Sequence, residues 1–192
     1  MKYFMGIAPP ADIQAQLDDL RRRYPGRHAD HIEPHITLIP PADYTETAEW
    51  LHALQSVLKK HAPFFLSLGS CAWFGQRVLY LSVLPAVASE GAPVPSTDPL
   101  GMLRQDLLDR TNSWRAQCGL GSQSEERPFR PHVTLAMSSF GTGFDDMKKL
   151  AREADELSRA LASFPVNAVR VYARQKARWE RYDDLALAGS NV

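Results

Sequence analysis

The sequence contains one short pattern twice, as PHITL at residues 34–38 and as PHVTL at residues 131–135. The two strings differ only in Ile against Val, although they lie in different halves of the chain. With this composition, two strings of the type His-apolar-Thr-apolar arise by chance in about one of a thousand such chains. The repetition therefore indicates that both strings serve one purpose.

Each string has the alternation of a strand that is buried on one face. In an extended strand, alternate side chains share a face, so His35 and Thr37 point one way while the apolar residues beside them point the other way. The second string repeats this arrangement with His132 and Thr134. We expect the apolar residues to enter the core and the polar pairs to face a cavity.

Two imidazoles and two hydroxyls suit acid/base chemistry at a phosphate. A neutral histidine can take a proton from attacking water while a protonated histidine gives one to the leaving oxygen, and an ordinary pKa of about 6.5 makes both forms accessible near neutrality. Threonine hydroxyls can donate hydrogen bonds to the phosphate oxygens. This chemistry predicts no metal and no cofactor, and it leaves open whether His35 or His132 is the acid.

Other interpretations of the two strings remain. The histidines could be zinc ligands, but no third ligand has suitable spacing, and the threonines would then have no role. The cleft could belong to a non-catalytic module that binds nucleotides or RNA, or to a scaffold in which the motifs are incidental. A further polar alternation at Arg170, Tyr172 and Arg174 is interpreted as a solvated sheet face rather than a nucleotide contact.

Apolar periodicity along the rest of the chain predicts an α+β fold in a single domain, residues 1–192. Strands are expected at residues 2–8, 33–39, 64–68, 78–84, 130–137, 166–174 and 179–187. Helices are expected at residues 13–24, 50–58, 98–114 and 147–161, with Asp98 as the cap of the third. Residues 85–97 lack an apolar period and are predicted to be an exposed loop.

Composition limits the class of protein. The chain has 22 basic and 22 acidic residues, which argues against a broad surface that coats nucleic acid but not against a local phosphate site. Its two cysteines have no CxxC spacing, which favours a reducing cytoplasm. The apolar start is too short for a secretory signal, and no stretch predicts a membrane span or an obligate protein partner.

The two motifs resemble the signature of the 2H (two-histidine) phosphoesterase superfamily, which includes the 2′–5′ RNA ligase and RNA cyclic phosphodiesterase proteins. Residues 2–3, 24–35, 129–132 and 179–187 are most similar to its small YjcG-type branch. The resemblance implies a bilobal α+β fold, in which two antiparallel sheets face each other across a central cleft with helices on the outside. It also implies that His35 and His132 are catalytic and that Thr37 and Thr134 bind phosphate.

One position departs from the pattern. RNA-ligase-like members commonly carry a basic residue shortly after the second motif, where this chain has Met137. A cation for the phosphate must then come from elsewhere, and Arg130 is the candidate. The expected activity is metal-independent opening of a 2′,3′-cyclic phosphate, or cleavage or formation of a 2′–5′ linkage, on RNA ends or small nucleotides. The sequence does not distinguish hydrolysis from ligation.

Overall fold

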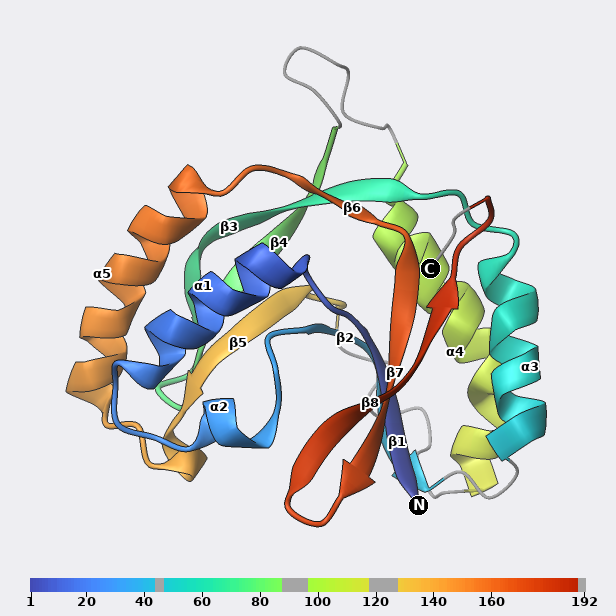
Figure 1. Ribbon diagram of the computed structural model, residues 1–192, viewed down its shortest axis with the longest axis horizontal. Helices are drawn as coiled ribbons and strands as arrows, with labels where there is room; N and C mark the ends of the chain where they lie inside the picture. Colours follow the sequence, from blue (N-terminus) through green and yellow to red (C-terminus); the bar gives the residue numbers. More distant parts are fainter. Residues whose placement is uncertain (44–46, 88–96, 118–127, 190–192) are drawn as a thin grey trace.

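The computed structural model describes residues 1–43, 47–87, 97–117 and 128–189. In these residues the strands form one antiparallel sheet of eight strands, in the order β6-β3-β4-β5-β2-β1-β7-β8 (Figure 1). The strands are β1 (Lys2–Ile7), β2 (Ile36–Asp43), β3 (Phe64–Phe74), β4 (Val78–Ala86), β5 (His132–Met137), β6 (Phe164–Val166), β7 (Ala168–Gln175) and β8 (Arg178–Ala186).

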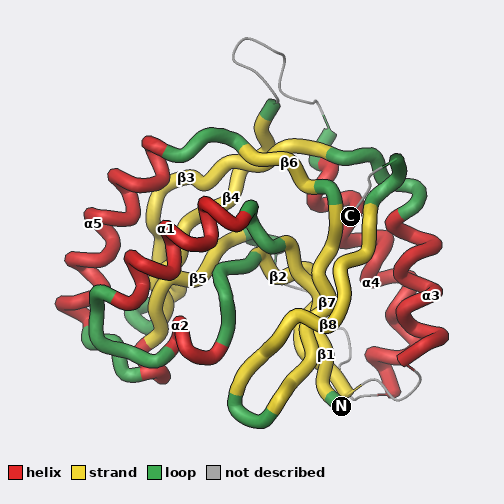
Figure 2. The backbone as a smooth tube through the Cα atoms, viewed as in Figure 1, coloured by secondary structure: helices red, strands yellow, loops and turns green. Residues whose placement is uncertain are grey.

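Two pairs of helices lie on opposite sides of the molecule (Figure 2). The helices are α1 (Ala11–Arg22), α2 (His28–His31), α3 (Thr47–Leu58), α4 (Pro99–Gln117) and α5 (Phe144–Ala160), with a 3₁₀ turn at Ser138–Phe140. Helix α5 packs against α1 and on β3 and β4, whereas α4 packs against α3 and contacts β2. No helix in the described part of the chain is long and apolar enough to cross a membrane.

The sheet corrects one prediction. The α+β class with antiparallel strands is confirmed, but the strands form one curled sheet and not two separate sheets (Figure 1). The reason is a backbone pairing between β2 and β5 at Ile36 and Val133, which joins the strands of the first motif to those of the second.

Local boundaries differ from expectation at a few points. Strand β3 runs through Gly69, and the turn to β4 is made at Gly75, where a φ of +57° suits glycine. The segment between the helix expected at residues 13–24 and the strand expected at residues 33–39 contains the short helix α2. Asp98 caps α4 as expected, since its Oδ1 accepts a hydrogen bond from the Gly101 amide at 3.0 Å. Most of the predicted loop, residues 88–96, lies outside the described residues.

The motif strands are buried on one face, as predicted. The alternating apolar residues Ile36, Leu38, Val133 and Leu135 are at most 1% exposed. The histidines and threonines between them are half-buried, as residues that face a cavity would be. The alternation therefore holds in both motifs.

Candidate active site

Strand pairing places the two motifs side by side. The backbone of Ile36 in β2 faces that of Val133 in β5 in antiparallel register. One step along this register in either direction sets Thr37 opposite His132 and His35 opposite Thr134. Because opposite residues of an antiparallel pair project to the same face, each histidine has the threonine of the other motif as its neighbour.

Both histidines are anchored in the same way. Nδ1 of His35 donates to the Glu33 carbonyl oxygen at 2.9 Å, and Nδ1 of His132 donates to the Arg130 carbonyl oxygen at 2.7 Å. Since a carbonyl only accepts, Nδ1 carries the proton and the Nε2 lone pair remains when the ring is neutral. Among the described residues, no group forms a hydrogen bond with either Nε2.

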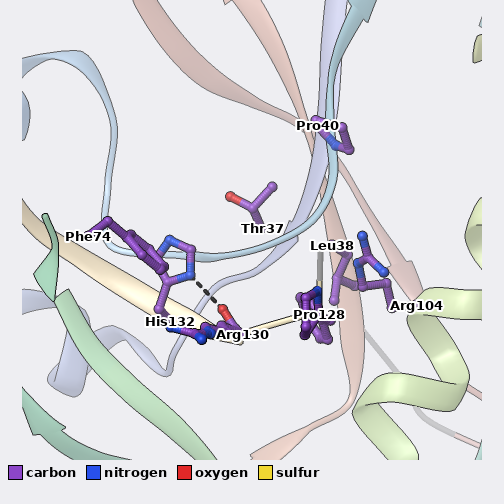
Figure 3. Close-up of a pocket in the computed structure, with 9 residues that line it drawn as sticks. Thr37, Leu38, Pro40, Phe74, Arg104, Pro128, Arg130 and His132 are labelled. Carbon is purple, nitrogen blue, oxygen red and sulfur yellow. Dashed lines mark hydrogen bonds between the residues drawn. The ribbon is translucent and has the colours of Figure 1, made fainter. Parts of the chain in front are cut away.

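A cavity of about 580 Å³ opens beside His132 (Figure 3). Three of the five predicted site residues line it, namely Thr37, Arg130 and His132, while His35 and Thr134 adjoin these three through the strand pairing. The remaining lining residues are Leu38, Pro40, Phe74, Arg104, Pro128 and Phe129. Sequence reasoning missed Arg104, because a helical arginine carries no sign of which cavity it reaches.

Two aromatic rings lie beside His35. Its ring lies 5.0 Å from that of Phe4 and 5.5 Å from that of Tyr172, and the latter two rings stack in parallel at 4.3 Å. On the neighbouring strand β1, a Cβ added to Gly6 would lie 2.7 Å from the Ile36 carbonyl oxygen and 3.4 Å from Cδ2 of His35. Glycine therefore allows β1 to approach the motif strand closely.

A network of charges supports the anchor of His35. The Glu33 carboxylate accepts hydrogen bonds from Arg170 Nη1 at 2.6 Å and from the Tyr172 hydroxyl at 2.8 Å. Arg170 also donates to both carboxylate oxygens of Asp184, at 2.7 and 2.8 Å. The interpretation of this strand face as solvated is therefore wrong for Arg170 and Tyr172, and Tyr172 is 0% exposed.

Burial shifts the histidines toward the neutral form. It lowers the pKa of His35 to about 4, although the hydrogen bond to Glu33 and the charge of that carboxylate act in the opposite direction. Repulsion from Arg21 and from His132 lowers this pKa further, as expected if the two imidazoles are close together. Burial also lowers the pKa of His132, partly offset by its bond to the Arg130 carbonyl.

The described ranges contain no group of three or more His, Cys, Asp or Glu side chains placed to hold a metal ion. His35 and His132 thus have no third potential ligand within those ranges. Metal independence stays a prediction about activity, which the experiment below addresses.

A sheet that sets two His-x-Thr strands side by side is the arrangement expected of a two-histidine phosphoesterase. The chain belongs to the 2′-5′ RNA ligase superfamily, because residues 9–178 match the model of that family. This confirms the resemblance to the 2H phosphoesterases. Over 97% of its length the chain is 26% identical to a protein named "Putative phosphoesterase" from Oceanobacillus iheyensis, covering 98% of that protein.

Two further similarities concern proteins with named RNA or nucleotide ligands. The chain is 28% identical over 96% of its length to an RNA 2′,3′-cyclic phosphodiesterase of Geobacillus stearothermophilus, but it spans only 55% of that relative. Its fold is similar to that of LigT from E. coli, crystallised with 3′-AMP, with a TM-score of 0.55, 21% identity and coverage of 97% and 98% of the two chains. At that identity the likeness to LigT shows the fold alone.

Proposed function

We propose that this protein is a metal-independent phosphoesterase that opens 2′,3′-cyclic phosphates on RNA ends or small nucleotides. The observation that carries the proposal is the pairing of β2 with β5, together with the matching anchors that leave both Nε2 atoms available. Membership of a superfamily of phosphoesterases and ligases supports this chemistry. Among the substrates possible for this protein, the name of the Geobacillus relative favours a 2′,3′-cyclic phosphate.

We assign the base to His35, because its ring is the more buried of the two and burial lowers its pKa to about 4, and the acid to His132, which lines the cavity. Nε2 of His35 takes a proton from water while the water oxygen bonds to phosphorus. The bond from phosphorus to one ribose oxygen breaks, and protonated His132 gives its proton to that oxygen. The products are a phosphomonoester on one ribose hydroxyl and a free neighbouring hydroxyl. A ribose hydroxyl that attacks in place of water would form a 2′–5′ linkage with the same two groups.

The remaining predicted residues bind the phosphate in this proposal. The hydroxyls of Thr37 and Thr134 donate hydrogen bonds to the non-bridging oxygens, where negative charge grows in the transition state. Arg130 lines the cavity with an exposed side chain and supplies positive charge that Met137 cannot. Neither role requires a cofactor.

The test is turnover of adenosine 2′,3′-cyclic phosphate by the purified protein, with and without excess chelator. We expect equal rates in the two conditions and a single phosphomonoester product. Activity that disappears with chelator and returns with zinc or manganese would identify the histidines as metal ligands. Binding of the nucleotide without turnover would favour the non-catalytic module.

A further inference from the structure

Arg104 has no part in the mechanism above, yet it lines the same cavity as His132 and Thr37. We propose that Arg104 forms a second phosphate subsite that recognises a phosphate on the 5′ side of the reacting nucleotide. This inference rests on the proposed function and deepens it, because it selects phosphorylated nucleotides or RNA ends over simple nucleoside cyclic phosphates.

The position of Arg104 separates it from the reacting phosphate. Figure 3 shows Arg104 on the opposite side of the cavity from His132, beside Leu38 and Pro128. When His132 and Thr37 hold the reacting phosphate, Arg104 is therefore placed to contact another part of the substrate. The cavity of about 580 Å³ is within the range of roughly 300–1,000 Å³ typical of small-molecule sites, so it has room for more than one phosphate group.

The lining of the cavity defines the chemistry of that substrate. The charged side chains on its walls are two arginines, and no carboxylate is among the described residues that line it. The other walls are largely apolar and suit a ribose and the face of a base; they include Pro40, Phe74, Pro128 and Phe129. An aromatic body with an anionic group at each end is the complement, and arginine is the side chain best suited to phosphate geometry.

Arg104 is also held in place before any ligand binds. It projects from α4 and is half-buried, and its guanidinium carbon lies 4.5 Å from the centre of the Phe129 ring. Stacking of this kind uses the flat face of the guanidinium, whereas phosphate is bound through its N–H edge, so both contacts can exist together.

The experiment compares kcat/KM for adenosine 2′,3′-cyclic phosphate with kcat/KM for the same compound carrying a 5′-phosphate, and for a dinucleotide that ends in the cyclic phosphate. The wild type should prefer the two substrates with a second phosphate. Arg104→Gln should reduce that preference about tenfold, as expected for one lost charge-assisted hydrogen bond. A reduction for the dinucleotide identifies an RNA strand as the ligand, and a reduction for the 5′-monophosphate alone identifies a mononucleotide.

The matched control is Arg110→Gln. Arg110 lies on the same helix with its guanidinium carbon 5.8 Å from the Trp114 ring centre, but it does not line the cavity, so the preference should stay at the wild-type value. A preference unchanged in Arg104→Gln, or no preference in the wild type, overturns the subsite.

A wild type that turns over none of these compounds overturns the proposed function instead. The subsite is then judged by calorimetry with adenosine 3′-phosphate and adenosine 3′,5′-bisphosphate. Tighter binding of the bisphosphate that Arg104→Gln weakens about tenfold supports the subsite. Equal weakening of both ligands overturns it.

Discussion

The two histidines have the same backbone anchor but different surroundings. Each imidazole lies beside two aromatic rings, those of Phe4 and Tyr172 for His35 and those of Phe74 and Tyr80 for His132. His35 also adjoins the Glu33 carboxylate network, whereas His132 lines the cavity. Burial lowers the pKa of both rings, that of His35 to about 4. The base is assigned to His35 because its ring is the more buried one, and the acid to His132 because it lines the cavity.

Replacing either histidine by alanine should reduce kcat/KM on a 2′,3′-cyclic phosphate by about 10²–10⁴-fold, the range for loss of a positioned acid or base. Thr37→Ala and Thr134→Ala should each reduce kcat/KM by about tenfold, because each removes one hydrogen bond to a charged group. Steady-state kinetics measure these losses, and circular dichroism checks folding. Near-normal turnover by folded His132→Ala would contradict the two-histidine mechanism.

The pH dependence of kcat/KM should be bell-shaped, with its maximum below the ordinary histidine pKa of about 6.5. The rate rises as His35 loses its proton near pH 4 and falls as His132 loses its own, whose pKa burial also lowers. A pH–rate series between pH 3.5 and 9 measures both limbs. A maximum above pH 7 would show that the lowered pKa values do not govern the reaction.

Glu33→Gln should move the acid limb of that profile to lower pH. The Glu33 carboxylate raises the pKa of His35, so removing its charge lowers that pKa and extends the range in which the base is neutral. Asp184→Asn is the control, because it removes the charge of the other carboxylate that binds Arg170, and that charge does not act on the pKa of His35. A shift of the alkaline limb instead would mean that His35 is the acid.

At the scale of helices and strands, much of the fold could be predicted because it depends on local patterns. Apolar periodicity located the main helices, and the Asp98-Pro99 pair marked the start of α4. The pairing of Ile36 with Val133 was not visible in that way, since it joins strands far apart in the chain. The hydrogen bonds of Arg170 to Asp184 on β8 and to Glu33 before β2 were equally invisible in the sequence, as was the position of Arg104 at the cavity.

Gly6 controls the spacing of β1 and β2 at the site. A Cβ there would lie 2.7 Å from the Ile36 carbonyl oxygen, a backbone atom that can move only with its strand. Gly6→Ala should therefore lower the free energy of unfolding by about 2 kcal/mol and reduce kcat/KM, because His35 is displaced with β2. Urea unfolding and kinetics measure the two effects.

The control for this substitution is Gly143→Ala, at the start of α5. A Cβ there would meet nothing nearer than a carboxylate oxygen at 3.8 Å, so its effect on stability should be small and its effect on kcat/KM absent. If both alanine variants behaved alike, close approach of β1 would not be what positions His35.

At the scale of the whole molecule, one curled sheet carries both motifs, so the site depends on the complete fold rather than on one half. The turn that leads from α1 into β2 is fixed by a buried arginine. Arg21 donates from Nη2 to Nδ1 of His28 at 3.0 Å and to the Ile32 carbonyl oxygen at 2.9 Å. His28 is 8% exposed, and burial, with repulsion from Arg21, His31 and His35, lowers its pKa to about 3.

This cluster predicts that the protein loses stability in mild acid. In the unfolded chain His28 takes a proton near pH 6.5, whereas in the folded chain it does so only near pH 3. Between these values the unfolded state binds more protons, so the free energy of unfolding falls as the pH falls and levels off below about 3. His28 alone should account for about 3 kcal/mol between pH 6.5 and 4.

Urea unfolding at intervals across this range measures the slope of the free energy of unfolding against pH, for the wild type and for His28→Asn, whose side-chain oxygen can still accept a hydrogen bond from Arg21. The slope should be smaller in His28→Asn and unchanged in His52→Asn, which alters an exposed histidine on α3. Equal slopes for His28→Asn and the wild type would mean that the proton is taken up elsewhere, since only a histidine kept neutral by the fold links its protonation to unfolding.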